Sequence, residues 1–259
     1  MSSSSPYLDA SNPDLPVRGF LHRAADPNAD GLILTHGAGA NCQAPLLVVL
    51  AEAFAASGIA VLRCDMPFRQ LRRSGPPPRG SAERDQAGLR AAVTSMHRET
   101  AGRIFLGGHS YGGRQASMLA AAEPALVEAL LLLSYPLHPP KRPEQLRTSH
   151  FADLKTPALF VHGARDGFAT HAEMETALAL IPARTELLSV PSAGHELMNP
   201  RNRTELSPDV VRTFLHFVDV AKLSIEKESA QQLSALGASA PQFPAILRRK
   251  PRRKADEVE

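Results

Sequence analysis

Six short apolar runs recur along the chain, and a stretch with helical periodicity follows most of them. Each run is largely continuous rather than alternating, which is typical of strands covered by helices on both faces. The predicted strands occupy residues 31–37, 59–65, 103–109, 129–135, 157–163 and 185–191. The predicted helices occupy residues 44–57, 82–99, 113–122, 171–180 and 207–223. This alternation predicts an α/β fold with an open, mostly parallel twisted sheet and helices on both faces.

The 259 residues suit one large domain better than two. We expect an N-terminal extension over residues 1–16, the α/β domain over 17–223, and a basic, mobile tail over 224–259. Residues 221–259 carry eight Lys or Arg and five Asp or Glu, which accounts for the whole net charge of +3. The neutral body gives no case for binding nucleic acid. The tail cluster RRKPRRK (248–254) could bind nucleic acid or anionic surfaces weakly, or be a solvated end.

The remaining composition bears on the cellular compartment and on cofactors. Cys42 and Cys64 are the only cysteines and show no metal-like spacing, which fits a reducing compartment. The first residues have neither the charged nor the apolar region of a signal peptide, and no apolar run reaches membrane-spanning length. We therefore expect a cytoplasmic protein without a membrane segment, a metal ion or an organic cofactor.

The stretch GHSYG (108–112) stands between a predicted strand and a predicted helix. In that context the pattern G-x-S-x-G predicts a sharp turn that presents Ser110 as a nucleophile above the edge of the sheet. Glycine is needed at Gly108 and Gly112 because larger side chains would collide across the turn. His109, inside the turn, should point back into the fold. The alternative is a serine in a glycine-rich turn shaped only for packing.

A nucleophilic serine needs a base, and the base needs an orienting acid. On this fold both should follow later strands, in the order serine, acid, histidine. The run at 157–163 is followed by Asp166, and the run at 185–191 is followed by His195. We predict a catalytic set of Ser110, Asp166 and His195. Alternatively, Asp166 caps a turn and His195 is a capping or surface residue.

Acyl transfer also needs donors for the developing oxyanion. We expect the backbone amides of Tyr111, directly after the nucleophile, and of Ala38, in the loop THGAGANC after the first run. His36 comes too early in the chain order to be the base, so it is a structural or substrate-binding residue. With Gly37 of the same loop and His138 after the fourth run, it completes the candidate substrate-binding residues.

Three segments together resemble one branch of the α/β-hydrolase superfamily: GHSYGGRQASMLA, SYPLHPPKRPEQLRTSH and FVHGARDGFAT. The branch is related to the dienelactone hydrolases and includes a testis-expressed hydrolase-like protein and a subunit of the NSL histone-acetyltransferase complex. The resemblance runs from about residue 31 to residue 217. It implies the α/β-hydrolase fold, with the family's motif positions at Ser110, Asp166 and His195. Tyr111 departs from an expected methionine, and dienelactone hydrolases proper use cysteine as the nucleophile.

Two loops bear on the substrate. Residues 136–156 are too few and too rich in proline for a large lid domain. The segment 66–84 carries five arginines, which form either a rim that attracts an anionic acyl substrate or acidic partner, or a solvated loop: Arg69, Arg72, Arg73, Arg79 and Arg84. The first hypothesis is a serine hydrolase for a small ester or thioester. The second is an interaction subunit that retains the fold, as some members of the branch do.

Overall fold

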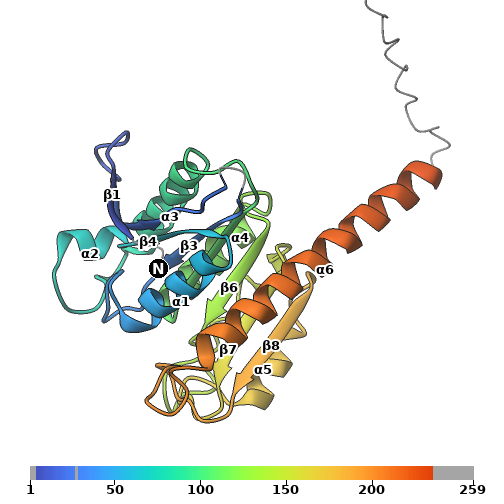
Figure 1. Cartoon of the computed structure of the whole chain (residues 1–259). Coiled ribbons are helices and arrows are strands. Elements are labelled where there is room, and N and C mark those ends of the chain that lie inside the picture. The colour runs from blue at the N-terminus through green and yellow to red at the C-terminus, as the bar shows by residue number, and fades with distance from the viewer. Residues whose placement is uncertain (1–3, 27–28, 236–259) are drawn as a thin grey trace, which may run out of the picture. The chain divides into compact units, whose positions relative to one another are not determined.

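The computed structural model describes residues 4–26 and 29–235 and contains one eight-stranded sheet (Figure 1). The strands are β1 (Ser5–Asp9), β2 (Val17–His22), β3 (Gly31–Thr35), β4 (Ala60–Cys64), β5 (Ile104–His109), β6 (Ala129–Leu133), β7 (Ala158–Gly163) and β8 (Thr185–Val190). Their order across the sheet is β1-β2-β4-β3-β5-β6-β7-β8. The pairs β1–β2 and β2–β4 are antiparallel, and every other pair is parallel. The predicted open, mostly parallel sheet is confirmed.

Helices cover both faces of this sheet (Figure 1). The helices are α1 (Pro45–Ala56), α2 (Pro67–Leu71), α3 (Ala82–Met96), α4 (Tyr111–Ala122), α5 (His171–Leu178) and α6 (Leu206–Ala235). On one face α1 and α6 pack against alternate strand residues such as Leu32 and Leu34. On the other face α3, α4 and α5 pack against the intervening residues such as Ile33. Successive side chains of a strand point to opposite faces, so a continuous apolar run serves both cores.

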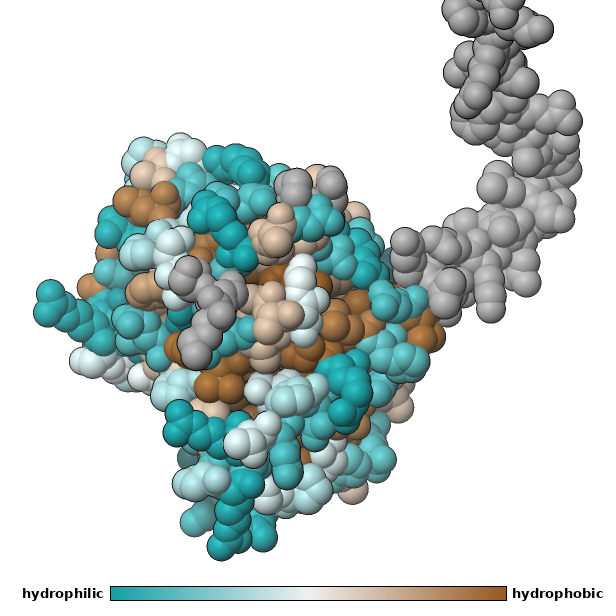
Figure 2. Space-filling view, viewed as in Figure 1, coloured by the Kyte–Doolittle hydropathy of each residue, from teal (hydrophilic) through white to brown (hydrophobic). Residues whose placement is uncertain are grey.

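The face seen in Figure 2 is mostly polar, with a band of apolar side chains across its middle, near α1 and α6. Apolar residues packed against the core from this side are only partly buried, among them Ala53, Leu188 and Leu215. No helix of the described part of the chain is long and apolar enough to cross a membrane.

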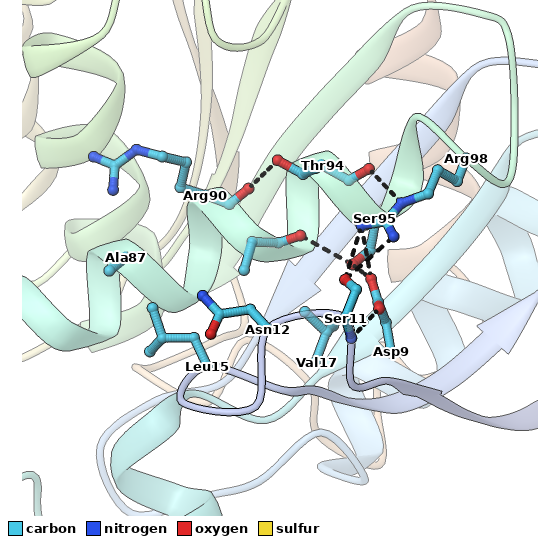
Figure 3. Close-up of a pocket in the computed structure, with 11 residues that line it drawn as sticks. Asp9, Ser11, Asn12, Leu15, Val17, Ala87, Arg90, Thr94, Ser95 and Arg98 are labelled. Carbon is cyan, nitrogen blue, oxygen red and sulfur yellow. Dashed lines mark hydrogen bonds and ion pairs between the residues drawn. The ribbon is translucent and has the colours of Figure 1, made fainter.

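The N-terminal segment belongs to the sheet, which corrects the predicted boundary at residue 17. Strand β1 pairs with β2, and Asp9 at its end contacts helix α3 (Figure 3). The Asp9 carboxylate accepts a hydrogen bond from Ser95 and forms an ion pair of 2.9 Å with Arg98. These bonds hold the pKa of Asp9 at about 2, because hydrogen bonds to the carboxylate favour its charged form. A hollow of about 330 Å³ lies between α3 and the loop that joins β1 to β2.

The last helix is longer than the sequence predicts. Helix α6 continues to Ala235, twelve residues beyond the predicted end at 223. The chain divides into a compact unit of residues 1–221 and a second unit of residues 222–259. The basic cluster at 248–254 lies outside the described residues.

The connection between β6 and β7 contains one short 3-10 helix, η1 (Phe151–Asp153), and no other helix or strand over its fully described residues 134–157. No lid domain is inserted there, as predicted. Both cysteines are buried and unpaired. Burial raises the pKa of the Cys42 thiol to about 12, and it raises the pKa of Cys64 as well.

Candidate active site

Ser110 stands on a strained turn between β5 and α4. Its backbone angles are φ 52° and ψ −115°, a region that non-glycine residues avoid. A Cβ atom on Gly108 would lie 2.8 Å from the carbonyl carbon of Gly112, and one on Gly112 would lie 2.7 Å from the carbonyl oxygen of His36. A side chain at Gly108 would therefore collide across the turn, as the sequence pattern indicates, whereas a side chain at Gly112 would collide with the end of β3 and the residue that follows it.

The structure brings Ser110, Asp166 and His195 together. His195 Nε2 lies 2.8 Å from Ser110 Oγ, and His195 Nδ1 lies 2.8 Å from Asp166 Oδ2. Asp166 follows β7 and His195 follows β8, so both loops meet the serine at the carboxyl ends of parallel strands. With Nδ1–H donating to the carboxylate, Nε2 is free to accept the serine proton. The arrangement can therefore generate an alkoxide nucleophile at Ser110.

Phe168 is a neighbour of this set that the sequence analysis missed. Its ring lies against the His195 imidazole at 4.1 Å between centroids, tilted by 30°. Its backbone N–H donates to Asp166 Oδ1 over 2.8 Å, which leaves Oδ2 for the histidine. Nothing in the order of motifs indicates this role, because an aromatic residue after a turn is usually a core residue.

The loop after β3 lies beside the nucleophile. A Cβ atom on Gly37 would lie 3.0 Å from His109 Nδ1 and 3.5 Å from Ser110 Cβ, so a larger residue there would require the His109 ring to shift. Among the residues that the structure describes, the amides of Ala38 and Tyr111 have no hydrogen-bond partner. The Tyr111 side chain turns away from the serine and donates to Asp85 on α3 over 2.8 Å. Of the two predicted oxyanion donors, the Ala38 amide thus lies on the loop after β3 and the Tyr111 amide at the first residue of α4, directly after Ser110.

Arg69 corrects the prediction for the arginine-rich segment. It is 6% exposed and donates to the carbonyl oxygens of Ala38, Ala40, Arg72 and Gly75. It therefore ties the loop carrying Ala38 to the segment after α2 and belongs neither to a rim nor to a solvated loop. The other four arginines of the segment are exposed: Arg72, Arg73, Arg79 and Arg84.

His36 is a buried imidazole and His109 is a partly buried one, and both lie near the start of α1. His36 Nδ1 donates to Gly37 O over 2.8 Å, and Nε2 accepts from the Met66 amide over 3.2 Å. His109 does not point back into the fold as predicted, because its Nε2 lies 2.8 Å from the carbonyl oxygen of His195. Burial lowers the pKa of both imidazoles, so they are neutral at pH 7.

A pocket of about 270 Å³ opens beside this loop. It is lined by His36, Gly37, Ala40, Ala44, Pro45, Leu46, Leu47, His109, Glu196 and Met198. Two of the candidate substrate-binding residues, His36 and Gly37, thus face a mostly apolar hollow. The third, His138, does not line it. Its Nδ1 donates to Pro139 O over 2.8 Å, and its Nε2 lies 3.5 Å from Glu173 on α5.

The strand order, the strained elbow between β5 and α4, and the loops after β7 and β8 define a protein of the α/β-hydrolase class. Residues 28–217 match the Alpha/beta hydrolase domain family, and the chain therefore belongs to that family.

Solved structures show the same fold at low sequence identity. A dienelactone hydrolase from Anabaena variabilis superposes with a TM-score of 0.64 at 22% identity, over 83% of this chain and 98% of that one. Est1E from Butyrivibrio proteoclasticus superposes with a TM-score of 0.65 at 16% sequence identity, over 84% of this chain and 100% of that one. An alpha-beta serine hydrolase homologue from Coxiella burnetii superposes with a TM-score of 0.64 at 20% sequence identity, over 82% of this chain and 98% of that one.

Among the described residues, no group of three or more His, Cys, Asp or Glu side chains could hold a metal ion.

Proposed function

We propose that the protein is a serine hydrolase that cleaves a small ester or thioester through a covalent acyl-enzyme. One observation carries the proposal: the His195 imidazole lies within hydrogen-bond distance of both Ser110 Oγ and Asp166 Oδ2. Family membership supports hydrolysis in general. The narrower branch indicated by the SYPLHPPKRPEQLRTSH segment stays a prediction.

In the proposed mechanism Ser110 Oγ attacks the carbonyl carbon while His195 Nε2 takes the hydroxyl proton. The Asp166 carboxylate keeps the imidazole in the correct tautomer and stabilises the imidazolium. The amides of Tyr111 and Ala38 donate to the oxyanion of the tetrahedral intermediate. His195 then protonates the leaving oxygen or sulfur, and a water molecule activated by His195 hydrolyses the acyl-enzyme.

A fluorophosphonate probe and a panel of p-nitrophenyl esters with different acyl lengths test this function. The probe should label the protein covalently, and short esters should be cleaved at pH 8. If the protein neither labels nor cleaves any ester of the panel, the hydrolase proposal fails and the interaction-subunit hypothesis replaces it.

If the acyl chain of the substrate occupies the pocket beside Gly37, the size of this pocket should determine which acyl lengths are hydrolysed. Ala44→Leu should narrow this pocket and reduce kcat/KM for p-nitrophenyl hexanoate about ten-fold or more relative to the acetate. The reason is that each methylene group that an apolar pocket no longer accommodates lowers kcat/KM about ten-fold or more. Ala53→Leu on α1, which does not line the pocket, should leave the ratio unchanged. An equal loss for both esters in Ala44→Leu would show that the acyl chain lies elsewhere.

A further inference from the structure

The imidazole of His109 presents an unused hydrogen-bond acceptor close to the nucleophile. Its Nε2 lies 2.8 Å from the carbonyl oxygen of His195, and a carbonyl oxygen only accepts, so Nε2 carries the ring proton. Burial holds the pKa of His109 below its ordinary value, which leaves Nδ1 unprotonated at pH 7. Nδ1 forms no hydrogen bond within the described residues and is not sealed from solvent. The proposed mechanism assigns no role to this atom.

The position of Gly37 shows where this acceptor points. A Cβ atom on Gly37 would lie 3.0 Å from His109 Nδ1 and 3.5 Å from Ser110 Cβ. Nδ1 therefore faces the space that the missing side chain of Gly37 leaves open, next to the nucleophile. Gly37 and His109 both line the pocket of about 270 Å³, so this space belongs to the same hollow. A part of the substrate that enters the pocket from the scissile carbonyl passes close to Nδ1.

The charges around the pocket decide which kind of group can use this acceptor. Among the described residues that line it, the side chain charged at pH 7 is that of Glu196, which disfavours an anion. Helix α1 begins at the pocket with Pro45, and no side chain caps its first turn. The amides of Leu46 and Leu47 therefore stay free at the positive end of the helix dipole, which disfavours a cation. A hydroxyl is neutral, donates and accepts, and so suits both surroundings.

The other imidazole of the pocket offers no acceptor. His36 Nδ1 donates to Gly37 O, and its Nε2 already accepts from the Met66 amide. Most of the remaining lining is apolar: Ala40, Ala44, Pro45, Leu46, Leu47 and Met198. Among the described lining residues, His109 Nδ1 is thus the one nitrogen or oxygen acceptor on an uncharged side chain that is free for a ligand.

We propose that His109 Nδ1 accepts a hydrogen bond from a hydroxyl group that the acyl part of the substrate carries a few bonds from the scissile carbonyl. The substrate is then a short hydroxyacyl ester or thioester whose apolar end fills the pocket beside Gly37. An analogue without the hydroxyl leaves Nδ1 against an apolar group and loses its hydration without a replacement, so it reacts more slowly. This inference rests on the proposed hydrolase function and adds the substrate class to it.

The first test compares p-nitrophenyl 3-hydroxybutyrate with p-nitrophenyl 3-methylbutyrate, in which a methyl group of similar size replaces the hydroxyl. Each rate is divided by the rate of hydrolysis in buffer alone. The wild-type kcat/KM should be about five- to ten-fold higher for the hydroxy ester, since one neutral hydrogen bond carries about this much discrimination. A pocket without an acceptor would favour the methyl ester. Equal values, or a preference for the methyl ester, would overturn the subsite and leave the hydrolase proposal standing.

Two substitutions of His109 separate its free acceptor from its bond to His195. Asparagine can place its amide oxygen near the position of Nδ1, whereas glutamine can place its NH₂ group near that of Nε2. His109→Asn should keep the preference for the hydroxy ester, although the lost bond to His195 O lowers activity toward both esters. His109→Gln should keep that bond and lose the preference. A preference that survives in His109→Gln would show that another group binds the hydroxyl.

The control for these variants is His97→Gln, at an exposed histidine directly after α3. This residue does not line the pocket, so kcat/KM for both esters and their ratio should stay at the wild-type values. A change of the ratio in His97→Gln would mean that the ratio does not report on the pocket, and the assignment to His109 would fail.

Binding to an inactive variant tests the subsite apart from catalysis. Ser110→Ala should bind 3-hydroxybutyramide with a lower Kd than 3-methylbutyramide in an NMR titration, and Ser110→Ala/His109→Gln should bind the two amides equally. If the amides bind in this way while the wild type neither labels with a fluorophosphonate nor cleaves an ester, the hydrolase proposal fails and the hydroxyl site stands. Equal binding of both amides to Ser110→Ala, or no binding of either, would overturn the subsite even in an active hydrolase.

Discussion

Ser110→Ala should abolish covalent labelling by a fluorophosphonate and lower kcat for p-nitrophenyl esters by about 10³-fold or more. The reason is chemical, since alanine has no oxygen to form the acyl-enzyme. Alanine also fits the strained backbone at φ 52° no worse than serine, so the fold should survive. Labelling detected by mass spectrometry and steady-state kinetics check both effects.

The same substitution at an exposed serine outside the candidate site is the control for this experiment. Ser149 is exposed on the loop between β6 and β7, and Ser149→Ala should label and turn over like the wild type. Circular dichroism should show the same melting temperature for the two variants within a few degrees. Covalent labelling that persists in Ser110→Ala would assign the nucleophile to another residue.

Asp166→Asn should lower kcat by up to about 10⁴-fold while the protein stays folded. The Phe168 amide decides how the new side chain lies, because it donates to Oδ1 and needs an acceptor there. An asparagine that keeps this bond must present its NH₂ group to His195 Nδ1. The imidazole then carries its proton on Nε2, the atom that faces Ser110, and cannot accept the serine proton.

The control is Asp153→Asn, which changes the same charge on an exposed residue and should leave kcat unchanged. Labelling of Asp166→Asn by the fluorophosphonate should slow in parallel with kcat, since both need the same base. Activity within about ten-fold of the wild type would show that Asp166 does not orient His195.

The parallel part of the fold could be predicted because its strands are continuous apolar runs, each serving two cores. Strands β1 and β2 could not, because SPYLD and VRGFLH are mixed in polarity rather than continuous apolar runs, and they form the antiparallel side of the sheet. Helix α6 was predicted too short for a different reason. The Ser-rich and charged composition after residue 223 is typical of a tail, although a helix tolerates these residues when it continues from a packed one.

The residues of the candidate site also fall into those that the sequence predicts and those that it does not. Chain order and strand ends predict Ser110, Asp166 and His195, because the carboxyl ends of parallel strands share one edge. The burial of Arg69 could not be predicted, since an arginine among exposed arginines gives no sign that it will donate to four carbonyl oxygens. The contact of His109 with the carbonyl oxygen of His195 depends equally on how two distant loops meet.

The rates at which the two buried thiols react with a disulfide reagent would report how often two different parts of the protein open. Only a thiolate reacts with a disulfide reagent, and burial suppresses that form at Cys42 and Cys64. Cys42 lies on the loop after β3, where its amide donates a hydrogen bond to Asp65 Oδ1, whereas Cys64 is the last residue of β4 inside the sheet. Cys42 therefore reports local release of the loop beside Ser110, and Cys64 reports the rarer event in which the sheet itself comes apart.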